Sequence, residues 1–398
     1  MSLAKQTFNH KALMWIATVI AFVQFTNALE YMVFNPIFVF MATDFAVPVS
    51  FSGYVSGMYT LGAVLSGIIA FYWIDHFNKK RFLIFNMALL GLLTLLTTCT
   101  SSFSLLLALR FCAGLVGGTT MGVGISILIN NAPPNLRGKM LATVIASFSI
   151  VSIVGMPTIL FLCTHYGWHV ALWLISALCV LALPLIVSFI PKDQISLDTF
   201  RAPPLDADTL LFASANALVQ FSPMLVIPIL APLMIQQLGA SQYLLPWLFF
   251  SGGVMGYVST KITGALTSRF SALLLATAST LIFILSLLIP MLGYQHAALF
   301  ISLFLGASYS RLVSSSVVTM QFPNDRQRAG FSSLQTSIMY LLTTVAFFLS
   351  AFLLPAHGMT PQSVNTLLAV CAISAAGFPI LIIILQKKLT KRFQMKEF

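Results

Sequence analysis

The chain has 398 residues, of which 59% are hydrophobic and 7% are charged, whereas soluble domains average about 25% charged residues. Because so few charges could not cover the surface of a soluble fold of this length, the composition predicts an all-α membrane protein surrounded by lipid. The net charge of +11 would suggest a nucleic-acid partner in a soluble protein, but most of the basic residues lie in short segments that flank apolar stretches, which excludes that interpretation.

Apolar windows long enough to cross a bilayer follow one another along the chain. A span needs about 20 apolar residues at about 1.5 Å of rise each. The first window continues to about residue 40, which is too long for a signal peptide, so we expect it to be retained as a span. The twelve windows cover roughly 13–40, 51–74, 82–99, 104–130, 141–162, 170–190, 209–235, 243–266, 272–292, 297–320, 331–354 and 364–386.

Basic residues alternate between successive loops. Of the 20 Lys and Arg residues, all but Arg110, Lys261 and Arg311 lie before the first window or after an even-numbered one. The loops after odd-numbered windows contain none. The positive-inside rule therefore predicts twelve transmembrane helices with both termini in the cytoplasm.

The longest connection, about 190–210, divides the windows into two sets of six. The segment "PPNLRGKM" after the fourth window recurs as "FPNDRQRAGF" after the tenth. We therefore predict an N-terminal six-helix lobe at 1–190, a cytoplasmic linker at 191–208, and a C-terminal lobe with a basic tail at 209–398. In proteins built from such repeats, the site lies between the lobes near the middle of the membrane.

Three motifs lie in order on the predicted spans. They are "FYWIDHFNKKR" around Asp75, "RFCAGLVGG" beginning at Arg110, and "VGMPTILFLCTHYGWHV", which contains Gly155 and Pro157. With these motifs the chain resembles the major facilitator superfamily, and in particular the twelve-span, drug:proton antiporter-like branch of bacterial efflux permeases. The first motif departs from the family pattern at Phe71, His76 and Asn78, and the third lacks the glycine usual after its proline.

The resemblance implies roles for these motifs. It implies a multi-pass protein of the bacterial inner membrane, and it gives Arg110 a part in proton transfer. It also implies that Asp75 stabilises one conformation of the protein through a charge relay, although a solvated loop acid is the alternative. The residues that it assigns to conformational gating are Asp75, Lys79, Lys80, Arg81, Gly155 and Pro157.

Glu30 is the only acidic residue in any predicted span, about 15 Å deep at about 1.5 Å per residue. Burial favours the protonated form of a carboxyl group and a nearby cation favours the carboxylate, so a solute could tip the balance between them. We predict that Glu30 takes part in proton coupling and substrate binding; a buried structural acid is the alternative.

Three basic residues also fall within spans, where charges are costly and mark candidate sites. Arg110 lies at a depth close to that of Glu30, so the two could pair, unless Arg110 extends to the headgroups. Arg311 lies near the middle of its span among serines, and either lines a cavity, where it binds an anionic group or pairs with Glu30, or ties to a backbone carbonyl. Lys261 is a substrate-binding candidate that could instead extend to the cytoplasmic surface.

Uncharged polar residues complete the predicted substrate site. Asn27, Tyr31 and Asn35 lie near Glu30, and Gln220 is a lone polar residue in the seventh window. Each of them either lines the cavity or holds two helices together.

These features predict a secondary transporter that exchanges protons for a small organic solute by alternating access, most simply as an exporter. The alternative is a carrier for an anionic metabolite or a siderophore-like carboxylate, because the spans hold more bases than acids. A channel or a membrane enzyme is a remote alternative, since no histidine has catalytic or metal-binding spacing. We expect a monomer whose partners are its solute, protons and membrane lipid, with no nucleic acid, metal or cofactor.

Overall fold

The computed structural model describes residues 10–73, 78–131, 133–191, 206–323, 328–354 and 359–394, and within these ranges it contains helices and no strands. The first seven α-helices are α1 His10–Met41, α2 Ser52–Trp73, α3 Lys79–Thr97, α4 Phe103–Asn131, α5 Pro134–Ile150, α6 Met156–Tyr166 and α7 Trp168–Phe189. The other eight are α8 Ala207–Val226, α9 Leu230–Gln236, α10 Leu245–Leu266, α11 Ala272–Met291, α12 Ala297–Thr319, α13 Arg328–Leu353, α14 Pro361–Ala376 and α15 Phe378–Gln394. Short 3₁₀ turns η1 Val49–Phe51, η4 Ile227–Ile229 and η5 Gln242–Leu244 lie beside them.

Three of the long helices are interrupted rather than ended. A π-helical turn, η3 Val151–Gly155, joins α5 to α6, the turn η4 joins α8 to α9, and Gly377 alone separates α14 from α15. Pro157, Pro228 and Pro379 lie at these interruptions, because proline removes a backbone N–H and breaks the helical hydrogen-bond ladder. If each interrupted helix counts once, the described residues form twelve rods that match the twelve predicted windows.

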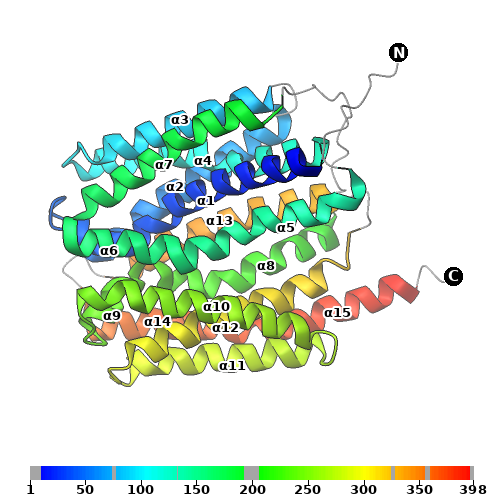
Figure 1. Ribbon diagram of the computed structural model, residues 1–398. Coiled ribbons are helices and arrows are strands. Elements are labelled where there is room, and N and C mark those ends of the chain that lie inside the picture. Colours follow the sequence, from blue (N-terminus) through cyan, green and yellow to red (C-terminus); the bar gives the residue numbers. More distant parts are fainter. Residues whose placement is uncertain are drawn as a thin grey trace, which may run out of the picture.

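Ten of these rods are long and apolar enough to cross a membrane. The rods of α2 and α10 are not among the ten, so the twelve-span count stays a prediction. Most of the predicted linker, residues 192–205, lies outside the described residues, and so does Asp75. Helix α1 begins and α15 ends at the same end of the bundle, here called the terminal end; the opposite end, which holds Met41 and Gln236, is called the far end (Figure 1).

Local sequence signals set several helix starts. Asn78 accepts a hydrogen bond from the Arg81 N–H at 3.0 Å and so caps α3, and Asp206 caps α8 in the same way through the Thr209 N–H at 2.8 Å. Between α6 and α7, Gly167 adopts a φ of +90°, which favours glycine. This turn places the Trp168 indole N–H 2.6 Å from Oδ2 of Asp44, which ties the α6–α7 corner to the segment after α1.

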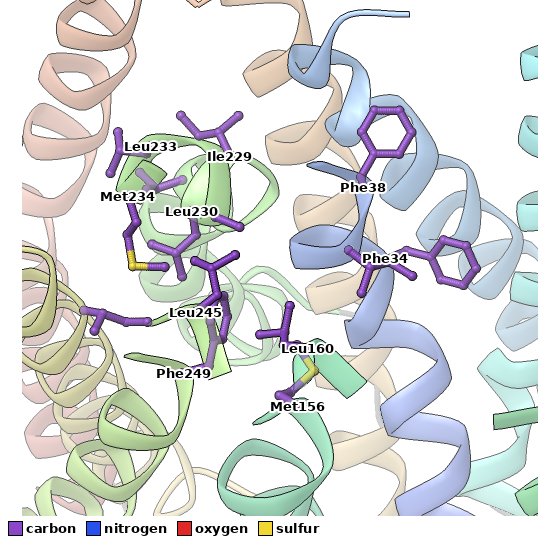
Figure 2. Packing of buried hydrophobic residues seen from close by; sticks show 14 of the residues in the cluster. Phe34, Phe38, Met156, Leu160, Ile229, Leu230, Leu233, Met234, Leu245 and Phe249 are labelled. Atoms are coloured by element: carbon purple, nitrogen blue, oxygen red, sulfur yellow. The ribbon is translucent and has the colours of Figure 1, made fainter. Parts of the chain in front are cut away.

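The buried apolar residues form three clusters that divide the bundle unevenly. One cluster, at the far end, contains residues of both halves of the chain, including Phe34, Phe38, Leu230 and Met234, and Figure 2 shows residues of the two halves together there. At the terminal end, one cluster uses only buried residues between 13 and 190 and another only those between 212 and 389. The two halves therefore share one core at the far end and have separate cores at the terminal end.

Candidate functional site

A buried ion pair joins α1 to α4. Nη1 of Arg110 donates a hydrogen bond to Oε1 of Glu30, and the two side chains are 1% and 0% exposed. Thr94 on α3 also donates to the same oxygen, at 3.5 Å. The sequence allowed Glu30 and Arg110 to pair because they lie at similar depths, and the structure contains this pair.

The ion pair has an aromatic surround and unfilled hydrogen-bonding capacity. The Arg110 guanidinium lies 3.7 Å from the ring centroid of Phe34 and 4.6 Å from that of Tyr59, so cation–π attraction supports its charge. Oε2 of Glu30 and two of the Arg110 nitrogens, Nε and Nη2, have no partner among the described residues. A proton on Oε2 would therefore break none of the hydrogen bonds described for this pair.

Three tyrosines connect the pair to the other half of the chain. Tyr59 stacks on Tyr31 with ring centroids 5.0 Å apart, and Tyr340 of α13 meets the edge of Tyr31 at 6.4 Å. Beside them, the Thr344 hydroxyl on α13 donates to the Thr60 hydroxyl on α2 at 2.8 Å. Movement of α13 relative to α1 and α2 would therefore change the surroundings of Glu30.

The predicted amide residues hold helices together in this state. The Asn27 amide donates to the Gly117 carbonyl at 3.2 Å, which ties α1 to α4. The side-chain amide oxygen Oδ1 of Asn35 accepts from the Ser56 hydroxyl at 2.6 Å, which ties α1 to α2. Gln220 on α8 is half-buried and lies in the other half of the chain.

Two predicted substrate residues lie away from the ion pair. Arg311 on α12 is fully buried, and its nearest polar contacts are the Ser222 hydroxyl at 3.2 Å and the Ala375 carbonyl at 3.4 Å. It forms the backbone tie that the sequence left open as an alternative and does not meet Glu30. The Lys261 side chain is exposed on α10, with Nζ 5.6 Å from the Tyr257 ring centroid, so in this state it lies on the exterior of the bundle.

The basic residues of the first motif lie at the start of α3. Lys79 is buried, and Arg81 is exposed with its backbone N–H on the Asn78 cap. The Lys80 ammonium donates to the carbonyls of Val187 and Ile190 at 2.8 and 2.5 Å, where a cation complements the C-terminal end of α7. Asp75, the acid of the expected charge relay, lies outside the described residues.

The third motif forms the π-helical turn between α5 and α6. Gly155 ends η3 and Pro157 follows in the first turn of α6. A Cβ atom on Gly155 would lie 2.9 Å from Leu29 of α1. The same turn packs against α10 of the other half, since a Cβ on Gly253 would lie 2.6 Å from the Ser152 carbonyl oxygen. The motif therefore lies where the two halves of the chain meet.

The sequence alone did not single out Thr94, Tyr59 or Tyr340. Threonine and tyrosine are ordinary in apolar spans, and only the rotation of each helix places these side chains beside Glu30. A partial signal was present for Tyr59, because Gly114 and Gly117 on α4 leave the space that Tyr59 occupies.

Comparison with known families and proteins agrees with this architecture. A model of the Major Facilitator Superfamily matches residues 20–346. Among curated proteins, a chloramphenicol resistance protein of Streptomyces lividans is 21% identical over 287 residues, which is 70% of this chain and 73% of that protein. The purine ribonucleoside efflux pump NepI of Escherichia coli O6:H1 is 22% identical over 329 residues, covering 80% of this chain and 82% of the pump.

Solved structures share the fold at lower identity. A bacterial homologue of the human lysosomal transporter Spinster superposes with a TM-score of 0.71 at 15% identity, over 96% of this chain and 99% of that one. A variant of the nucleoside transporter NupG gives a TM-score of 0.72 at 12% identity, over 94% of this chain and 99% of the other.

Proposed function

The chain belongs to the major facilitator superfamily, and on that premise we propose that it is a proton-coupled secondary transporter that exports a small organic solute. The observation that carries the coupling step is the buried pair of Glu30 and Arg110. Glu30 is the only acid in a predicted span, and one of its oxygens has no partner among the described residues. A carboxyl group held between desolvation and a neighbouring cation can bind or release a proton when its surroundings change.

Alternating access supplies that change of surroundings. The two halves share an apolar core at the far end and have separate cores at the terminal end, which fits a state closed at the far end. Tyr340 and Thr344 of α13 contact Tyr31 and Thr60 beside the pair. Rocking of the halves would break those contacts and admit water to Glu30. With the termini in the cytoplasm, as the loop charges predict, the present state faces inward.

Two relatives support export: one is an efflux pump for purine ribonucleosides and the other is a chloramphenicol resistance protein. We therefore propose solutes of that size and moderate polarity. The test uses purified protein in liposomes with an imposed pH gradient and radiolabelled adenosine or chloramphenicol. One proton exchanged for one uncharged solute across one pH unit is worth about 1.4 kcal/mol, so it supports about a tenfold solute gradient.

We expect saturable accumulation of at least one of the two solutes, which collapses on addition of a protonophore. Saturable flux that does not depend on the pH gradient would contradict proton coupling and would indicate a facilitative carrier. Flux of neither solute would contradict the proposed solute class, and a wider panel of solutes would then test coupling.

Gly253→Ala is expected to weaken closure at the far end. The new methyl group would press on the Ser152 carbonyl of η3, and overpacking of this kind costs about 1–3 kcal/mol. Because the cost applies only while the halves touch, the population open at the far end should rise by about 5- to 150-fold. The measurement is the rate at which a membrane-impermeant maleimide labels Ala231→Cys, a buried far-end position, in a background without the native cysteines.

Gly264→Ala on the same helix is the matched control, since a Cβ there has no neighbour within 4 Å. Labelling should stay at the parental rate in this control. Equal labelling rates in the Gly253 and Gly264 variants would count against separation of the halves at this contact.

A further inference from the structure

Arg311 carries a buried positive charge that the described residues do not compensate. Its side chain is fully buried on α12, and no acidic side chain among the described residues pairs with it. Glu30 is the one carboxylate within the predicted spans of the whole sequence, and it already pairs with Arg110. A buried charge without a partner is strongly destabilising, so a counterion beside this guanidinium would stabilise the folded protein.

The Ala375 carbonyl, which also accepts from the Gly377 N–H, explains only part of this arrangement. Pro379 has no N–H to give the Ala375 carbonyl four residues earlier, and Nη2 of Arg311 donates to that carbonyl at 3.4 Å and to the Ser222 hydroxyl at 3.2 Å. Both distances are long, and both acceptors are neutral. Nε and Nη1, which carry the other three N–H donors of the guanidinium, have no partner in the described part of the chain.

The surroundings of Arg311 parallel those of Arg110. Each guanidinium lies against two aromatic rings, which for Arg311 are Phe283 and Phe378 with centroids at 4.6 and 5.4 Å. Each guanidinium also donates a hydrogen bond to a side chain on the first long helix of its half of the chain. In both halves the contacted residue lies six positions before a proline.

On α1 that position, before Pro36, is Glu30, and on α8, before Pro228, it is Ser222. Where Arg110 meets a carboxylate, Arg311 meets a hydroxyl. The second arginine therefore has the donors and the desolvated setting of the first, but not its anion.

We propose that Arg311 binds a small monovalent anion at one edge of its guanidinium, with the unpartnered Nε or Nη1 and the Ser222 hydroxyl as donors. A carboxylate or a chloride ion has the required chemistry, and its source is either the acidic group of a transported solute or a free inorganic ion. The pockets beside Tyr309 (about 50 Å³) and Gln295 (about 520 Å³) do not include Arg311. The anion is therefore one that a small movement of Ser222 and its neighbours can admit, which excludes bulky anions.

The first test measures thermal unfolding of the full-length protein in detergent, with sodium formate, sodium acetate and sodium chloride titrated at constant ionic strength. A ligand that binds the folded state stabilises it by mass action, so the wild-type midpoint should rise saturably by a few degrees. The rise should be absent in Arg311→Gln. Chloride alone raising the midpoint would identify an inorganic ion, and the carboxylates alone a solute group; either supports the site. No saturable rise in the wild type would overturn it.

Ser222→Asp tests the same site without removing the arginine. The new carboxylate would stand beside Arg311 as Glu30 stands beside Arg110, so the ligand-free protein should unfold at a higher temperature than wild type and should no longer respond to the anions. Ser222→Ala adds no charge but removes one proposed donor, so the response should persist and need higher anion concentrations than in the wild type. An anion response in Ser222→Asp equal to that of the wild type would place the binding elsewhere.

This inference is independent of proton coupling by Glu30. Binding in detergent involves no gradient and no transport, so a negative result there leaves the proposed function standing. Conversely, loss of coupled transport in a Glu30 variant says nothing about anion binding at Arg311.

Discussion

Replacing Glu30 by glutamine is expected to abolish proton-driven accumulation of solute while leaving solute exchange intact. Glutamine has nearly the shape of glutamic acid and can still accept a hydrogen bond from Arg110, but it does not titrate. Exchange of solute for solute moves no net proton, so it needs only the alternating conformations. The solute gradient of about tenfold per pH unit, which one coupled proton supports, should fall to about one.

The same change should also destabilise the protein. Arg110 is 1% exposed and would lose its counterion, and breaking one side of a buried pair costs about 3–5 kcal/mol. The aromatic rings of Phe34 and Tyr59 would offset part of this cost. A fall in the unfolding midpoint should therefore accompany the loss of coupling.

A double variant separates the two effects. Glu30→Gln combined with Arg110→Met removes both buried charges, and replacing a whole buried pair by neutral groups is often neutral or stabilising. We expect the unfolding midpoint to return toward that of the wild type without recovery of accumulation. Proton-driven accumulation that survives in Glu30→Gln would assign coupling to another group.

The helices could be predicted because their signals are local. Hydropathy over about 20 residues marks each span, and the prolines and Gly377 lie where the structure interrupts a rod. The ion pair could be predicted from the sequence for a related reason. Depth along a helix follows from residue number at about 1.5 Å per residue, and Glu30 and Arg110 have similar depths.

Rotation about each helix axis could not be predicted in the same way. Residue number gives the depth of Arg311 and Lys261, but packing decides which way each side chain points. The structure turns Arg311 into the interior of α8–α15 and leaves Lys261 exposed. Tyr340 reaches Tyr31 only because α13 packs on α2, a contact between segments that are far apart in sequence.

Glycine positions were recognised as a motif, but their partners came from the structure. Gly114 and Gly117 lie on the face of α4 toward Tyr59 of α2. On the other side of the contact, Gly62 of α2 faces the Phe111 carbonyl and Leu115 of α4. Small residues at such crossings let two backbones approach closely in a membrane, and here the close approach holds Tyr59 against Arg110.

Gly114→Ala is therefore expected to damage both stability and transport. A Cβ atom at Gly114 would lie 2.7 Å from the Tyr59 carbonyl carbon and 2.9 Å from its Cα, and backbone atoms cannot rotate away. Overpacking costs about 1–3 kcal/mol, which exceeds the gain of about 0.8–1 kcal/mol in helix propensity that alanine brings over glycine. Separation of α2 from α4 should also draw Tyr59 away from Arg110, so proton-driven transport should fall with the unfolding midpoint.

Gly122→Ala on the same helix is the matched control for this effect. A Cβ there has no neighbour within 4 Å, so only the propensity gain applies, and the unfolding midpoint should hold or rise. Comparison of the two alanine variants by thermal unfolding and by proton-driven uptake cancels the shared change in helix propensity. If Gly114→Ala unfolds at the same temperature as Gly122→Ala, the α2–α4 crossing is not the tight contact that positions Tyr59, and the support of Arg110 must come from Phe34 and Glu30 alone.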